Sequence, residues 1–204
     1  MIKIAVLVSG GGTNLQALID AEKKGIIKNG AIALVVSNNA GAYALERARG
    51  AGIDRCVLPK RDFASQAAFE EALIGVLRER GIEFVVLAGF MSILSKRFTD
   101  AYQGRIINVH PSLIPSFCGQ GFYGLKVHEA ALAKGVKVTG ATVHFVNEVA
   151  DGGEIILQKA VRVLPNDTPE KLQKRVMRQA EWIILPQATE LICKKLSEEK
   201  GDKL

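Results

Sequence analysis

Residues 2–24 read IKIAVLVSGGGTNLQALIDAEKK and form the clearest strand–turn–helix unit in the chain. The segment Ile2–Val8 is a continuous apolar and β-branched run, which is typical of a strand buried on both faces. Three glycines end this strand, and a helical pattern follows through about Lys24. Such a unit is the usual opening of an α/β fold with a parallel sheet.

The same alternation continues along the chain. Further strands are predicted at residues 32–37, 55–58, 84–88, 105–109, 138–146 and 154–163. Helices are predicted at residues 43–49, 65–80, 95–102, 127–134 and 168–196. In the last of these, Leu172, Val176, Ile183 and Leu191 are expected to form the buried stripe, and Pro186 is expected to kink the helix.

This pattern predicts an α/β fold with a single open, mostly parallel twisted sheet and helices on both faces. It is Rossmann-like, with an antiparallel element near the C-terminal strands. We expect residues 1–204 to form one domain. Ligands of such sheets bind beyond the carboxyl ends of the strands, here near residues 9–14, 37–39, 88–94 and 108–115.

The composition is that of a globular protein, with 48% hydrophobic and 24% charged residues. Its formal net charge of +6 comes from 27 Lys and Arg against 21 Asp and Glu. The charges are interleaved and aromatic residues make up only 6%, so a solvated surface or a small anionic substrate explains them better than nucleic acid. The longest apolar stretch, residues 84–94, is too short to cross a membrane. Three cysteines without paired spacing favour a reduced, cytoplasmic protein.

The glycine turn, SGGGTN at residues 9–14, presents backbone N–H groups at a helix N-terminus, where phosphates bind. A dinucleotide fingerprint does not fit, because its third glycine would fall at Leu15 and residues 37–39 contain no acidic side chain. A P-loop is excluded because no Gly-Lys-Ser/Thr follows. Two interpretations remain: a monophosphate seat aided by Thr13 and Asn14, or a tight turn that one of these side chains caps.

Asn108 and His110 end a predicted central strand, and strand alternation puts them on one side. Histidine can carry protons near pH 7, and an amide can donate to a developing oxyanion. Alternatively, both side chains only satisfy loop backbone. Asp151, before two glycines, could orient His110 and favour its protonated form, or it could belong to an ordinary turn.

Other chemistries find less support in the sequence. The pair His128 and Glu129 fails the zinc pattern because position 132 is Leu, so no metal site is expected. His144 lies inside a strand, where a packed or hydrogen-bonded histidine is the usual interpretation. Cys118 is interpreted as a loop thiol rather than a nucleophile, because nothing near it in the sequence would lower its pKa.

Five segments occur in an order that resembles the phosphoribosylglycinamide formyltransferases, folate-dependent enzymes of purine synthesis. They are SGGGTN at 9–14, LAGFMSIL at 87–94, INVHPSLIP at 107–115, TVHFV at 142–146 and DGG at 151–153. The resemblance implies formyl transfer from the co-substrate 10-formyltetrahydrofolate to the amine of phosphoribosylglycinamide, without a metal. It also implies small-molecule substrates, no membrane or nucleic-acid partner, and a monomer or homodimer.

The resemblance assigns roles to particular residues. Catalysis is expected at Asn108, His110 and Asp151. Binding of the phosphoribosyl substrate is expected at Gly12, Thr13, Asn14, Pro111 and Glu181. Folate binding is expected at Gln66, Met91, Ser92, Ile93, Leu94, Asn108, Val146, Asn147 and Asp151.

Some positions depart from the family pattern. Gln66 and Ser92 stand where relatives often carry arginine, and one residue is inserted just before Glu181. Methionyl-tRNA formyltransferase and formyltetrahydrofolate hydrolase share the Asn-x-His core but add further domains, for which we expect no room in 204 residues. A non-catalytic phosphosugar or nucleotide sensor on the same fold is the alternative from another class.

Overall fold

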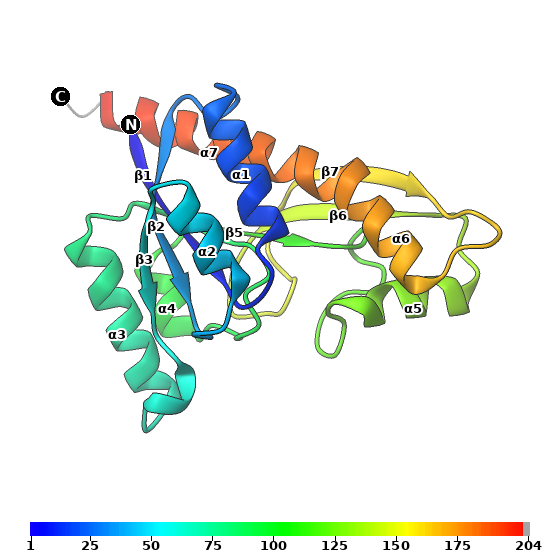
Figure 1. Ribbon diagram of the computed structural model, residues 1–204, viewed down its shortest axis with the longest axis horizontal. Coiled ribbons are helices and arrows are strands. Elements are labelled where there is room, and N and C mark those ends of the chain that lie inside the picture. The colour runs from blue at the N-terminus through cyan, green and yellow to red at the C-terminus, as the bar shows by residue number, and fades with distance from the viewer. Residues whose placement is uncertain (202–204) are drawn as a thin grey trace.

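The computed structural model describes residues 1–201 and contains a seven-stranded sheet in the order β3-β2-β1-β4-β5-β6-β7 (Figure 1). The strands are β1 (Ile2–Val8), β2 (Gly30–Ser37), β3 (Asp54–Val57), β4 (Phe84–Leu87), β5 (Ile106–His110), β6 (Val138–Phe145) and β7 (Ile155–Arg162). The helices are α1 (Thr13–Lys23), α2 (Tyr43–Gly50), η1 (Lys60–Asp62), α3 (Gln66–Glu79), α4 (Lys96–Ala101), α5 (Leu125–Lys134), α6 (Pro169–Val176), η2 (Met177–Glu181) and α7 (Trp182–Gly201).

The strand pairing confirms the predicted fold class. All pairs from β3 to β5 are parallel, whereas β6 pairs antiparallel with both β5 and β7. Strand β1 lies between β2 and β4, so the order of the strands reverses at β1. Open α/β sheets bind ligands at such a reversal, beyond the carboxyl ends of the strands.

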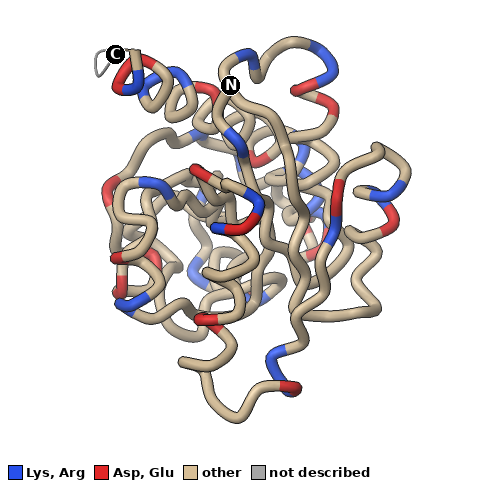
Figure 2. The backbone as a smooth tube through the Cα atoms, turned by 90° about the vertical axis from the view of Figure 1, so that its left-hand side faces the viewer, with Lys and Arg blue, Asp and Glu red and all other residues tan. Residues whose placement is uncertain are grey.

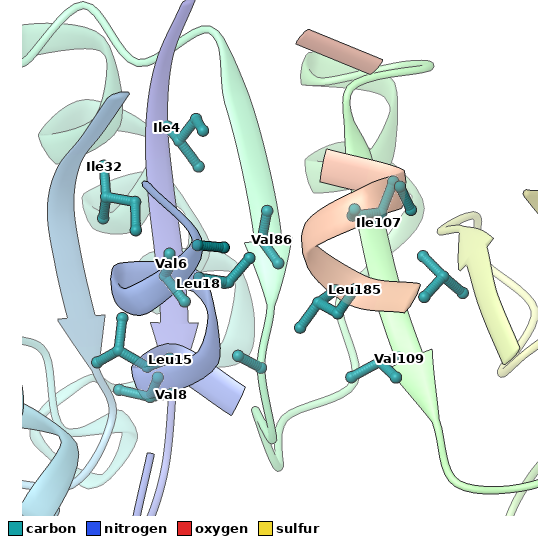
Figure 3. Packing of buried hydrophobic residues seen from close by; sticks show 14 of the residues in the cluster. Ile4, Val6, Val8, Leu15, Leu18, Ile32, Val86, Ile107, Val109 and Leu185 are labelled. Carbon is teal, nitrogen blue, oxygen red and sulfur yellow. The ribbon is translucent and has the colours of Figure 1, made fainter. Parts of the chain in front are cut away.

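Helices cover both faces of the sheet. The larger core joins one face to α1, α2, α5, α6 and α7, and the smaller core joins the other face to α3 and α4. Figure 3 shows Leu18 and Leu15 of α1 near Val6 and Val8 of β1, and Leu185 of α7 near Ile107 and Val109 of β5. Alternate residues of the buried strands therefore supply two separate cores, which explains their continuous apolar sequences.

The last helix differs from the prediction in its buried face. Ile183 and Leu191 are 39% and 51% exposed, whereas their neighbours Ile184 and Ile192 are 3% and 7% exposed. The cause is η2, a π-helical turn, which holds one more residue per turn than an α-helix and moves the inward face by one position. A kink was expected at Pro186, but α7 continues through this residue. The irregular segment is instead η2, which precedes the proline.

Lysine and arginine alternate with acidic residues along the chain in Figure 2, as the sequence indicates. Within residues 1–201, no helix combines the length and hydropathy that a membrane span requires.

The shifted face of α7 can be tested with two adjacent substitutions. Ile192→Ala should lower the free energy of unfolding by about 2–4 kcal/mol, because it leaves a cavity in the core. The matched control Leu191→Ala should change it by less than about 1 kcal/mol, because this side chain is half exposed. Urea denaturation measures both values, and the reverse order would show that the inward face is wrongly placed.

Candidate active site

A cavity of about 670 Å³ opens at the strand reversal, where the segments after β1, β4 and β5 meet the loop before α5. It brings together many of the residues singled out from the sequence: Asn14, Met91, Ser92, Ile93, Asn108, His110, Pro111, Asp151 and Glu181. A neighbouring cavity of about 120 Å³ adds Leu94, Val146 and Asn147 and shares Asn108 and Asp151 with the first. Segments far apart in the chain thus form one two-part site.

Neither Thr13 nor Asn14 caps the helix that follows the glycine turn, although the sequence allowed either. Gly12 is the N-cap of α1, and no side chain caps the helix. Its φ of 70° is left-handed, and a Cβ there would lie 2.6 Å from the Cβ of Ala44 in α2, so glycine is required. The first-turn N–H groups of α1 are left without a side-chain acceptor, an arrangement suited to an anion.

Asn14 is held by Glu181 instead of capping its helix. Its Nδ2 donates to Oε2 of Glu181 over 2.8 Å, joining α1 to the π-helical turn. Glu181 is 6% exposed, and burial raises the pKa of its carboxyl to about 7 although the Asn14 bond opposes the shift. The pair places a carboxyl group that titrates near neutral pH beside the glycine turn.

The segment after β4 is held by hydrogen bonds from three directions. The N–H of Met91 donates to Oγ of Ser9 over 2.8 Å, and Nδ2 of Asn38 donates to Oγ of Ser92 over 2.9 Å. Nε2 of Gln66 donates to the Ile93 carbonyl over 2.7 Å. The two residues that depart from the family pattern, Gln66 and Ser92, therefore position the backbone of residues 91–94.

Three predicted binding residues do not line these cavities. Gly12 shapes the turn, and Gln66 lies behind residues 91–94, where its amide also donates to the buried Glu70. Thr13 lines a separate cavity of about 400 Å³ between α1 and α7. The roles assigned to Gly12, Thr13 and Gln66 remain predictions.

His110 and Asp151 meet inside the larger cavity. Nδ1 of His110 lies 3.4 Å from Oδ2 of Asp151, and its Nε2 lies 2.9 Å from the carbonyl oxygen of Phe117. The N–H of Gly119 donates to the same Asp151 oxygen over 2.9 Å. The loop at residues 117–119 thus contacts both groups of the pair.

The pKa values of this pair reflect opposing effects of burial and of nearby charges. Burial lowers the pKa of His110, and the nearby Asp151 and the Phe117 carbonyl only partly oppose it. Asp151 thus favours the protonated form of His110, as predicted, but burial outweighs this attraction in the net shift of the pKa. Burial alone would raise the pKa of Asp151, but its contacts with His144 and His110 and the hydrogen bond from the Gly119 N–H together hold it below its usual value.

Two further histidines belong to this region, and neither was predicted as a site residue. His144 of β6 lies opposite Asn108 of β5 and contacts both Asn108 and Asp151. His128 of α5 lines the larger cavity fully buried, its pKa lowered to about 4 by burial, with neither ring nitrogen hydrogen-bonded. Antiparallel pairing of the two strands was the signal for His144, but their register was not readable from the sequence.

Comparison with known proteins identifies the class. Residues 2–189 match the family model described as formyl transferase. The chain belongs to the formyl transferase family.

The most informative relatives carry a more particular name. The phosphoribosylglycinamide formyltransferase of Haemophilus influenzae is 42% identical over 186 residues, which cover 91% of this chain and 84% of that protein. The crystal structure of glycinamide ribonucleotide transformylase 1 from Symbiobacterium toebii is similar with a TM-score of 0.89 and 45% identity, over 96% of this chain and 89% of that one. The resemblance found in the sequence motifs is confirmed.

Other relatives are longer than this chain. The chloroplastic phosphoribosylglycinamide formyltransferase of Arabidopsis thaliana is 43% identical over 178 residues, which cover 87% of this chain and 61% of that protein. The trifunctional purine biosynthetic protein adenosine-3 of Gallus gallus is 46% identical over 94% of this chain, but the match spans only 18% of its length.

The titration of Glu181 predicts how stability depends on pH. Between pH 4.5 and about 7 the folded protein keeps a proton on Glu181 that the unfolded chain has released. The free energy of unfolding should therefore fall as the pH rises through this interval, by roughly 3 kcal/mol at most.

Urea denaturation of the wild type and Glu181→Gln across this interval isolates the effect, because their difference removes the other titrating groups. Relative to Glu181→Gln, the wild type should lose stability as the pH rises and should lose no more above about pH 7. A difference independent of pH would show that Glu181 has an ordinary pKa.

Proposed function

We propose that this protein transfers the formyl group of 10-formyltetrahydrofolate to the amine of 5′-phosphoribosylglycinamide, giving formylglycinamide ribonucleotide and tetrahydrofolate. The convergence of Asn108, His110 and Asp151 on the cavity at the strand reversal carries this proposal. Membership of the formyl transferase family and the names of the relatives support it.

The two cavity parts suit the two substrates. Gly12, Thr13, Asn14, Pro111 and Glu181 are assigned to the phosphoribosyl substrate, whose phosphate the uncapped N-terminus of α1 would bind. The pterin ring of the folate is assigned to the smaller cavity and residues 91–94, where backbone groups are held in place by Ser9, Asn38 and Gln66. The reacting atoms would meet between them, next to Asn108 and His110.

The proposed chemistry begins when the substrate amine attacks the formyl carbon. A carbon–nitrogen bond forms, and the carbonyl electron pair moves to oxygen, where the Asn108 amide donates a hydrogen bond. Nε2 of His110 carries a proton, because the Phe117 carbonyl can only accept, and the formyl oxygen would replace that carbonyl. A proton on Nδ1 would face Asp151. The bond to the folate nitrogen then breaks, and the amine proton reaches that nitrogen through His110 or a bound water.

Residues 1–204 are proposed to act as one formyltransferase domain, as a monomer or homodimer. All seven strands of the described residues lie in one sheet, which supports a single folding unit. The three cysteines are free, which favours the reducing cytoplasm as its location.

Steady-state assays test the assignment. With both substrates, Asn108→Ala, His110→Ala and Asp151→Asn should each lower kcat by about 100-fold or more, because each removes a group next to the reacting atoms.

The matched control is Asp100→Asn, which removes an exposed carboxylate of α4 and should leave kcat unchanged. Near-wild-type kcat in all three folded variants would reject the catalytic assignment. Tight substrate binding by a wild type without turnover would instead favour a sensor.

A further inference from the structure

His144 connects two of the proposed catalytic residues at the wall of the smaller cavity. It is 2% exposed, and its Nε2 lies 3.3 Å from Nδ2 of Asn108 and 3.5 Å from Oδ1 of Asp151. Its other ring nitrogen, Nδ1, lies 2.7 Å from the carbonyl oxygen of Phe145. Both ring nitrogens are therefore engaged by the protein.

Hydrogen-bond chemistry determines which nitrogen carries the proton. A backbone carbonyl can only accept, so Nδ1 of His144 is the protonated nitrogen. In the neutral ring Nε2 is then a lone pair, which accepts from the Nδ2–H of Asn108 at 3.3 Å. Oδ1 of Asp151 lies farther from Nε2, at 3.5 Å, and only a doubly protonated ring could donate to it. The Phe145 carbonyl thus selects the tautomer through a contact outside the cavity.

The lone pair on Nε2 in turn selects the orientation of the Asn108 amide. If the amide were turned over, its Oδ1 would face this lone pair and be repelled. With Nδ2 toward His144, one amide proton is bound to the ring and the second remains for the cavity that Asn108 lines. At the position that Nδ2 occupies, this orientation offers a donor to an oxyanion, whereas Oδ1 in the same position would repel it.

We propose that His144 is a positioning residue that turns the Asn108 amide so that its Nδ2 can donate to the developing oxyanion. The catalytic consequence rests on the proposed formyl transfer, whereas the orientation itself is a property of this chain. The strand register is responsible, because Asn108 of β5 pairs directly with His144 of β6.

Kinetics provide the first test. His144→Phe should lower kcat by 10- to 100-fold, as loss of an orienting partner typically does, while KM for both substrates changes less than threefold. His144→Gln supplies an amide oxygen that can accept from Asn108, so it should recover most of kcat.

The matched control is Val143→Ala, the preceding residue of β6, whose side chain packs in the larger core on the other face of the sheet. It should lose stability and keep kcat. A His144→Phe variant with wild-type kcat, or equal losses in the Phe and Gln variants, would overturn the proposal.

Nitrogen-15 NMR of the wild type provides the second test, and it needs neither turnover nor a variant that folds. The His144 ring should carry its proton on Nδ1, with Nε2 unprotonated, and the Asn108 side-chain amide should show one hydrogen-bonded proton. A ring protonated on Nε2 would reject the proposal even if the enzyme is active. The expected tautomer in a wild type without formyl transfer would instead uphold the orientation and reject the proposed function.

Discussion

The antiparallel pairing of β5 with β6 is the constraint on which the site depends. It places His144 opposite Asn108 and Thr142 opposite His110 in the register of the two strands. The polar groups at the end of β5 are thereby faced by polar groups of β6. A slip of one residue in either strand would turn that strand's side chains to the other face of the sheet. The site therefore forms only in this register.

Burial gives these polar groups their chemical character. His110 and Asp151 are both withdrawn from water, and burial shifts the pKa of each toward the neutral form. For Asp151, two histidines and a backbone N–H reverse the shift, whereas for His110 desolvation prevails. His110 has an acceptor at each ring nitrogen, the Phe117 carbonyl and the Asp151 carboxylate, so the ring can gain and release a proton with little rearrangement.

An irregular helical turn near the C-terminus forms one wall of the larger cavity. The π-helical segment η2 brings Glu181 against Asn14 and shifts the face of α7 that packs on the sheet. Such turns often occur at functional sites, because the extra residue moves a side chain that regular helical geometry would place elsewhere. The family resemblance places an inserted residue just before Glu181, within this turn.

By itself, the sequence determined the fold class, the strand and helix order, and the motifs that carry the formyltransferase resemblance. Apolar periodicity and turn residues are local properties, so the strand at Ile2–Val8 and the glycine turn after it are predictable. The tertiary structure alone decided the cap of α1, the buried face of α7, the direction of the pKa shift of His110 and the place of His144. These depend on strand register, desolvation and contacts between residues far apart in the chain, which local patterns do not contain.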